Sequence, residues 1–130
     1  MSEKRVLLVD DEADILKVMG VRIKSWGYDL STARNAREAI EAVKAGGNDI
    51  IILDYMLPDM DGVEVLRNIR KINKKVPVIM FTAYPNTQAM NDSENLGISA
   101  FVAKLSSFSD TQELLKTAID MALKKIEKKN

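Results

Sequence analysis

The sequence predicts an α/β fold built on one doubly wound, five-stranded parallel sheet with five helices. Short apolar runs alternate along the chain with segments in which apolar residues recur at helical spacing, and turn residues separate the two kinds. Several runs are apolar on both faces, which is typical of strands covered by helices on both sides. Strands that alternate with helices in this way form parallel sheets with right-handed crossovers. The 130 residues are expected to fold as a single domain over positions 1–130.

Five apolar runs are the candidate strands. The first, third and fourth runs are apolar on both faces and are expected at the centre of the sheet. The second run alternates apolar with polar residues, so we expect it at an edge of the sheet. In chain order the candidate strands occupy residues 6–9, 28–33, 50–53, 76–81 and 100–103.

Apolar stripes at helical spacing mark the candidate helices between these runs. Gly27 fits the stop of the first helix, and Gly46 with Gly47 fits the stop of the second. The fourth helical segment is polar almost throughout, whereas the fifth carries the most continuous stripe. The stripes lie within residues 15–23, 36–43, 65–72, 86–96 and 115–126.

The amino-acid composition excludes several kinds of chemistry. The 19 basic residues balance 19 acidic ones, so net charge gives no signal for binding to nucleic acid or membrane. Cysteine and histidine are both absent, which excludes disulfides, thiolate or imidazole metal sites, and nucleophiles activated by histidine. The first apolar run is too short for a signal peptide or a membrane span, and we expect the protein to be cytoplasmic.

Polar residues follow directly on four of the candidate strands. They are Asp10 and Asp11 after the first run, Asp54 after the third, Thr82 after the fourth and Lys104 after the fifth. The carboxyl ends of parallel strands meet at one edge of a sheet, so we expect these side chains to lie together. A carboxylate after a strand is often only a helix cap, and Asp11 taken alone fits a cap equally well. The five residues together predict a functional site.

The residue types in this set suit phosphoryl transfer assisted by a divalent cation. Clustered carboxylates repel one another unless a cation lies among them, and an all-oxygen site suits Mg²⁺, with Mn²⁺ as an alternative. A carboxylate can also act as a nucleophile and form an aspartyl phosphate. Lys104 can supply a positive charge to the phosphoryl oxygens, and Thr82 can supply a hydroxyl donor.

Four stretches of the sequence resemble the receiver domains of bacterial two-component response regulators, the chemotaxis regulators among them. The stretches are residues 7–12, 53–62, 81–83 and 101–104, and the likeness runs in order and spacing from Lys4 to about Ile126. The resemblance implies a flavodoxin-like fold with strand order 2-1-3-4-5. This order agrees with an edge position for the second run.

The resemblance also implies roles for individual residues. Asp54 would be the phosphoacceptor, acting with Thr82 and Lys104, and Thr82 would form a switch pair with Phe101. Asp11 would bind the metal ion directly, whereas Asp10 would act largely through a metal-bound water. The full metal-binding set would be Asp10, Asp11, Asp54 and the backbone carbonyl of Met56.

Two positions call for comment against the family pattern. Phe101 stands where family members often carry tyrosine, so only burial of its ring can report on the switch, and a phenylalanine on a short strand is otherwise typical of plain core. Leu105 follows Lys104 where the family commonly has a proline joined through a cis bond. A cis bond costs about 0.5–1 kcal/mol before proline but about 2.5–4 kcal/mol before other residues, so we expect a trans bond between Lys104 and Leu105.

The leading functional hypothesis is a phosphorylation-driven switch in two-component signal transduction, not an enzyme with an independent substrate. Because the chain has no histidine, the donor would be a phosphohistidine on a sensor histidine kinase or a histidine phosphotransfer protein. Three alternatives fit less well. An aspartate-nucleophile phosphatase needs an Asp-x-Asp pair after the first strand, a flavin or nucleotide binder needs a Gly-rich loop there, and a degenerate receiver that only docks would lack part of the set of five.

The sequence defines the output of this switch less closely. We expect an output partner to bind the surface formed by the fourth helix, fifth strand and fifth helix, over residues 86–96, 100–103 and 110–126. The thin apolar anchoring of the fourth helix and its position after Thr82 suit a movable element. We expect no nucleic acid and no membrane to bind this domain. A stand-alone regulator and a receiver domain of a longer protein both fit the sequence.

Overall fold

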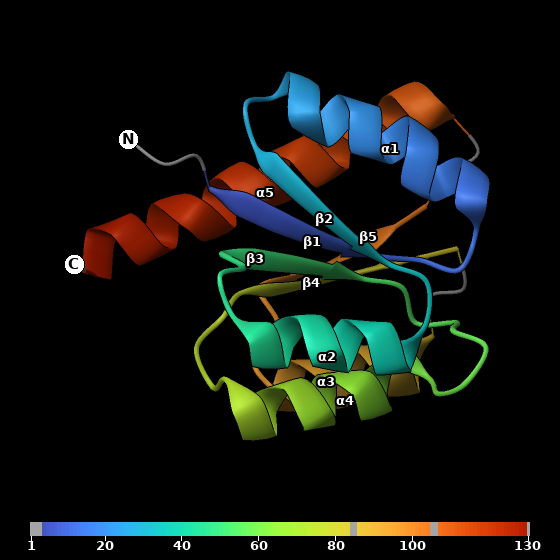
Figure 1. Cartoon of the computed structure of the whole chain (residues 1–130), viewed down its shortest axis with the longest axis vertical. Helices are drawn as coiled ribbons and strands as arrows, with labels where there is room; N and C mark the ends of the chain where they lie inside the picture. Colours follow the sequence, from blue (N-terminus) through green and yellow to red (C-terminus); the bar gives the residue numbers. More distant parts are fainter. Residues whose placement is uncertain (1–3, 84–85, 105–106, 130) are drawn as a thin grey trace.

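The computed structural model describes residues 4–83, 86–104 and 107–129, and it contains the predicted sheet. Five parallel strands lie in the order β2-β1-β3-β4-β5, and a helix follows each strand (Figure 1). The strands are β1 (Arg5–Val9), β2 (Asp29–Ala33), β3 (Ile50–Leu53), β4 (Val78–Thr82) and β5 (Ala100–Ala103). The helices are α1 (Ala13–Ser25), α2 (Ala36–Ala45), α3 (Gly62–Ile72), α4 (Thr87–Asn95) and α5 (Phe108–Lys129).

The helices cover both faces of the sheet, which confirms the predicted doubly wound architecture. The strand order confirms that β2 lies at an edge. Figure 1 shows α1 and α5 on one face and α2, α3 and α4 on the other. In the described part of the chain, no helix combines the length and the hydropathy of a membrane span.

Alternation along the central strands divides the core in two. In β1, Leu7 and Val9 pack on the side of α2 and α3, whereas Val6 and Leu8 pack on the side of α1 and α5. The same alternation continues in β3 and β4, where Phe81 lies on the α1/α5 side. These strands are buried from both faces, and this is why their runs are apolar without interruption.

The starts of β4 and α5 differ from those that the apolar pattern predicts. β4 begins at Val78 rather than at residue 76, because Pro77 has no backbone N–H to give to a sheet, although its carbonyl still accepts from the N–H of Ile51 at 3.0 Å. α5 begins at Phe108, well before its first stripe residue, Leu115. An apolar stripe marks the turns that face the core and leaves the exposed first turn of a helix unmarked.

Side-chain caps fix where three helices begin, next to the carboxyl ends of the strands. Asn35, Asp61 and Asn86 each accept a hydrogen bond from the backbone N–H of the third residue of α2, α3 and α4, at 2.8, 3.0 and 2.7 Å. In α1 the N-cap position is Glu12, and no side chain caps it. The reading of Asp11 as a cap of this helix is therefore wrong, and its carboxylate is left for another role.

The amino ends of the strands lie at the other edge of the sheet, where α1 ends. Trp26 occupies the C-cap position of α1 and donates its backbone N–H to the carbonyl of Arg22 at 3.1 Å. It is the one tryptophan of the sequence, and it packs, partly buried, against the α1/α5 side of the core.

Candidate functional site

Four polar residues lie where β1, β3, β4 and β5 end, at the carboxyl edge of the sheet. Asp10 and Asp54 directly follow β1 and β3, Thr82 is the last residue of β4, and Lys104 follows β5. Asp10 and Thr82 are inaccessible to solvent, and Asp54 is 4% exposed. Charged residues are almost never buried so fully unless they are paired, and buried titratable groups of this kind cluster at functional sites.

The ammonium of Lys104 joins the two buried carboxylates. Its Nζ lies 2.6 Å from Oδ2 of Asp10 and 3.3 Å from Oδ2 of Asp54. The backbone N–H of Lys104 donates to the carbonyl of Thr82 at 2.8 Å, and the ammonium lies 5.3 Å from the centre of the Phe81 ring, within cation–π range. The ends of β4 and β5 thus hold the lysine against the ends of β1 and β3.

Burial and neighbouring charges both shift the pKa values of Asp54 and Lys104. Burial raises the pKa of Asp54, the charge of Lys104 offsets this only in part, and the charge of Asp10 raises it further. Burial lowers the pKa of Lys104, but its contacts with the two carboxylates outweigh that effect and leave the pKa raised. Two carboxylates that face one ammonium carry an excess of negative charge, which a further cation can neutralise.

The acidic residues after β1 form the candidate metal centre. Carboxylate oxygens of Asp10, Asp11 and Glu12 lie within 4.8 Å of one another. One oxygen of Asp10 accepts from the backbone N–H of Glu12 at 3.0 Å, whereas Asp11 and Glu12 are exposed. Sequence reasoning missed Glu12 as a candidate ligand, although it is the third acidic residue of the run. In the described residues Asp54 is not part of this group and connects to it through Lys104.

The loop between β3 and α3 carries Asp54 and Met56. Oδ1 of Asp54 accepts a hydrogen bond from the backbone N–H of Met56 at 3.2 Å. Gly62 closes the loop by donating its N–H to the carbonyl of Tyr55 at 2.7 Å. A Cβ at this position would lie 2.7 Å from Tyr55 Cα and 2.8 Å from the carbonyl oxygen of Asp54, so only glycine permits the approach. The Met56 side chain is half exposed, and metal binding by its carbonyl stays a prediction.

The predicted switch pair spans two neighbouring strands. Thr82 ends β4 and is buried, whereas Phe101 lies opposite Met80 in the register of β4 and β5. The Phe101 ring is partly buried and packs against the α2/α3 side of the core, which is compatible with both a core role and a switch role. The peptide bond between Lys104 and Leu105 lies outside the described residues.

Comparison with known proteins identifies the family. The family model for the response regulator receiver domain matches residues 6–119. The chain belongs to the response regulator receiver family. Receiver domains take phosphoryl groups from histidine kinases in two-component signal transduction, and they bind Mg²⁺ at an acidic cluster.

Solved receiver structures share the fold of this receiver domain. A CheY-like receiver domain protein from Methanospirillum hungatei is 30% identical, with a TM-score of 0.84 over 95% of this chain and 99% of that one. The response regulator TrrA from Thermotoga maritima, in complex with Mg²⁺ and BeF, is 33% identical, with a TM-score of 0.75 over 88% of this chain and 98% of that one.

Curated relatives of this receiver domain include longer regulators. A probable transcriptional regulator, ycf27, from Cyanidium caldarium is 35% identical over 98% of this chain and 49% of its own length. The uncharacterised transcriptional regulatory protein YkoG from Bacillus subtilis is 33% identical over 80% of this chain and 46% of its own length. The receiver domain thus spans about half the length of these two relatives.

Proposed function

We propose that Asp54 is the phosphoacceptor of this receiver domain, and that the domain is a switch rather than an enzyme with a separate substrate. The observation that carries the proposal is the position of the Asp54 carboxylate at the end of a central strand, almost fully buried and 3.3 Å from the ammonium of Lys104. A lysine at this distance suits the oxygens of a phosphoryl group carried on the same carboxylate.

The proposed transfer uses groups that the chain and its donor supply. A carboxylate oxygen of Asp54 attacks the phosphorus of a phosphohistidine on a sensor histidine kinase or a histidine phosphotransfer protein. The O–P bond forms while the P–N bond to the imidazole breaks, and the imidazole nitrogen keeps the bonding electrons. Lys104 stabilises the charge on the transferred oxygens, and the hydroxyl of Thr82 donates to one of them.

We propose that Asp10, Asp11 and Glu12, together with Asp54 and the Met56 carbonyl, hold a magnesium ion, for which Mn²⁺ can substitute. The donor set fits, because all its ligand atoms are oxygens, and the carboxylates of Asp10, Asp11 and Glu12 already lie within 4.8 Å of one another. When bound, the ion supplies positive charge to the carboxylates and to the phosphoryl oxygens. The complex of TrrA with Mg²⁺ and BeF supports this assignment by likeness.

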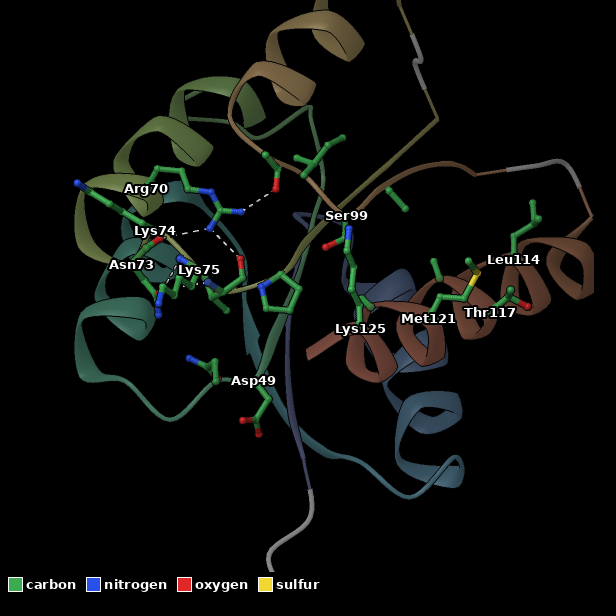
Figure 2. Close-up of a pocket in the computed structure, with 18 of the residues that line it drawn as sticks. Asp49, Arg70, Asn73, Lys74, Lys75, Ser99, Leu114, Thr117, Met121 and Lys125 are labelled. Atoms are coloured by element: carbon green, nitrogen blue, oxygen red, sulfur yellow. Dashed lines mark hydrogen bonds between the residues drawn. The ribbon is translucent and has the colours of Figure 1, made fainter. Parts of the chain in front are cut away.

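The output surface is proposed to be the face made by α4, β5 and α5. Ala89 and Ser93 are the buried residues of α4, so this helix has little core contact to hold it in one position. On α5, Leu114 and Met121 are 48% and 66% exposed, and they line a groove of about 1390 Å³ between α5 and the loop that joins α3 to β4 (Figure 2). Exposed apolar residues beside a groove suit a protein partner.

The named relatives support a transcriptional output, carried by the part of those regulators that this chain does not span. A stand-alone regulator remains the alternative. The absence of nucleic acid and membrane binding by this domain, and its cytoplasmic location, stay predictions.

The test of the phosphoacceptor is chemical labelling of the intact protein. The wild type, Asp54→Asn and Asp29→Asn are incubated with acetyl phosphate and Mg²⁺, and an added phosphoryl mass is sought by mass spectrometry. Asp29 lies at the start of the edge strand β2 and is exposed, so its replacement controls for the loss of one carboxylate.

We expect labelling of the wild type and of Asp29→Asn, none of Asp54→Asn, and none of any variant in excess chelator. Labelling of Asp54→Asn to the wild-type extent would overturn the assignment. Full labelling in chelator would overturn the metal requirement.

A further inference from the structure

The loop from Asp54 to Asp61 is closed on itself at its base. The N–H of Gly62 donates to the carbonyl of Tyr55, and Met56 and Asp61 form an isolated antiparallel bridge. These contacts fix both ends of the loop to β3 and α3. Between these ends, Leu57 and Met60 pack, partly buried, against the core on the α2/α3 side.

The middle of the loop is attached to a different helix by Asp59. Its Oδ1 accepts from the backbone N–H of Ala36 at 2.9 Å, and its Oδ2 accepts from the N–H of Arg37 at 3.2 Å. These are the first two residues of α2, whose amides have no partner within the helix. The amide of Ala36 above all lowers the pKa of Asp59, so the carboxylate is charged at neutral pH and suits the positive end of the helix dipole.

Helix α2 does not depend on this carboxylate for its cap. Asn35 already occupies the N-cap position, and its side chain accepts from the N–H of Glu38 at 2.8 Å. The start of α2 therefore has two acceptors of different origin. Asn35 comes from the helix's own flank, whereas Asp59 comes from the loop that carries the proposed phosphoacceptor. Loss of either acceptor weakens the start of α2, but only loss of Asp59 removes the hydrogen bonds between the loop and α2.

We propose that Asp59 is a positioning residue, which holds the β3–α3 loop against α2 and thereby sets the backbone of Met56 next to Asp54. Asp59 is exposed and acts on the site only through the chain that connects it to Met56. The inference rests on the proposed function, since it requires that Asp54 and the Met56 carbonyl belong to the metal and phosphoryl site. It predicts an effect of an exposed loop carboxylate on Mg²⁺ affinity.

The experiment compares Asp59→Ala with Asn35→Ala in the full chain. Both variants remove one side-chain acceptor from the start of α2, and thermal unfolding checks that both lose similar stability. Mg²⁺ is titrated into each protein, and amide chemical shifts near Asp10 and Asp54 give the concentration at half-saturation. Asp59→Asn, which keeps one carbonyl acceptor, serves as the conservative variant.

For Asp59→Ala we expect the half-saturating Mg²⁺ concentration to rise about three- to tenfold, below the roughly 10- to 100-fold typical of groups bonded directly to a metal ligand. Asn35→Ala should match the wild type, and Asp59→Asn should fall between the wild type and Asp59→Ala. At saturating Mg²⁺, labelling of Asp59→Ala by acetyl phosphate should return to the wild-type rate, because the positioning affects binding.

Two results would overturn the inference while leaving the proposed function intact. One is Mg²⁺ binding by Asp59→Ala at the wild-type concentration, and the other is an equal weakening in Asn35→Ala, which would show that α2 stability is the cause. A wild-type protein that neither binds Mg²⁺ nor labels at Asp54 would overturn the proposed function, and this inference with it.

Discussion

Two partly buried cations lie at opposite edges of the sheet, and different kinds of group hold them. Lys104, at the carboxyl edge, faces the carboxylates of Asp10 and Asp54. Arg70, near the end of α3 at the amino edge, bonds to backbone carbonyls among the described residues (Figure 2). These carbonyls are those of Val76 at 2.7 Å, Leu96 at 2.8 Å, Gly97 at 3.1 Å and Asn73 at 3.3 Å.

Because their partners differ, Lys104 and Arg70 are expected to respond differently to a change in charge. Burial lowers the pKa of Arg70, since carbonyl groups carry no net charge to oppose it. Burial also lowers the pKa of Lys104, but the carboxylates reverse the shift. The charge around Lys104 changes whenever a metal ion or a phosphoryl group binds, whereas the charge around Arg70 does not change. We therefore expect Arg70 to join α3, the start of β4 and the α4–β5 connection, and Lys104 to take part in the chemistry.

The largest expected effect is on the rate of phosphorylation. Lys104→Met should slow labelling of Asp54 by about 100- to 1000-fold, the loss typical in enzymes when one preorganised donor to a developing oxyanion is removed. Arg70→Met should label at the wild-type rate, because Arg70 touches none of the site residues. Time courses with acetyl phosphate at saturating Mg²⁺ measure both rates. Equal slowing in the two variants would show that the rate follows stability instead of charge.

The next effect is on stability and on its recovery by Mg²⁺. In chelator, Lys104→Met should lose about 3 kcal/mol of unfolding free energy, because Asp10 and Asp54 remain buried without a counter-charge. Added Mg²⁺ should restore part of this loss by binding the folded state. Arg70→Met should lose about 1–3 kcal/mol, since its carbonyl partners lose their donor, and Mg²⁺ should restore none of it. Urea unfolding with and without Mg²⁺ measures both losses. Equal recovery of the two variants by Mg²⁺ would contradict the proposed difference between Lys104 and Arg70.

A smaller effect concerns pH. The folded protein binds a proton at Asp54 more tightly than the unfolded chain does, because the pKa is raised from 3.8. The stability that this group contributes is therefore complete below the unfolded value and is lost as pH rises through the folded value. Asp54→Asn should be more stable than the wild type at neutral pH in chelator.

The advantage of Asp54→Asn should grow as pH rises through this acidic window and then level off. Arginine does not titrate in this range, so the stability difference of Arg70→Met should stay constant through the same window. Urea unfolding at a series of pH values measures both differences. A stability advantage of Asp54→Asn that shrank with rising pH would contradict the raised pKa.

The smallest effect is expected for a neighbouring cation on the same helix. Arg67 lies one turn before Arg70, is exposed, and forms an ion pair with Glu64. Arg67→Met should change the unfolding free energy by less than about 0.5 kcal/mol, because exposed ion pairs contribute little. The variant is a matched control for Arg70→Met in the same urea experiment. A loss as large as that of Arg70→Met would mean that charge on α3, and not the carbonyl contacts, stabilises this edge.

The edge position of β2 and the meeting of Asp10, Asp54, Thr82 and Lys104 could be predicted from patterns local to each strand, whereas the full strand order was implied by the resemblance to receiver domains. An alternating run belongs at an edge, and the residue after each parallel strand lies at the same edge of the sheet. The direct contact between Lys104 and Asp10 could not be predicted from this placement, since β3 and β4 lie between β1 and β5.

Hydrogen bonds between a side chain and a distant backbone group could not be predicted in the same way. Arg70 donates to the carbonyl of Leu96, and Asp59 accepts from the backbone N–H of Ala36, and both bonds join segments far apart in the chain. Backbone groups are alike at every position, so the sequence does not indicate which backbone carbonyl or N–H a side chain will bind. Glu12 was missed for a related reason, since a run of acidic residues does not show which carboxylates turn toward one another.

The position of Trp26 makes its fluorescence a probe of unfolding in the wild type and in every variant proposed above. The indole packs against the α1/α5 side of the core at the amino edge, away from Asp54 and Lys104 at the carboxyl edge. Its emission will follow the loss of that core when the chain unfolds, and binding at the carboxyl edge will leave it nearly unchanged. Unfolding of every variant can therefore be followed with the same signal whether or not Mg²⁺ is present.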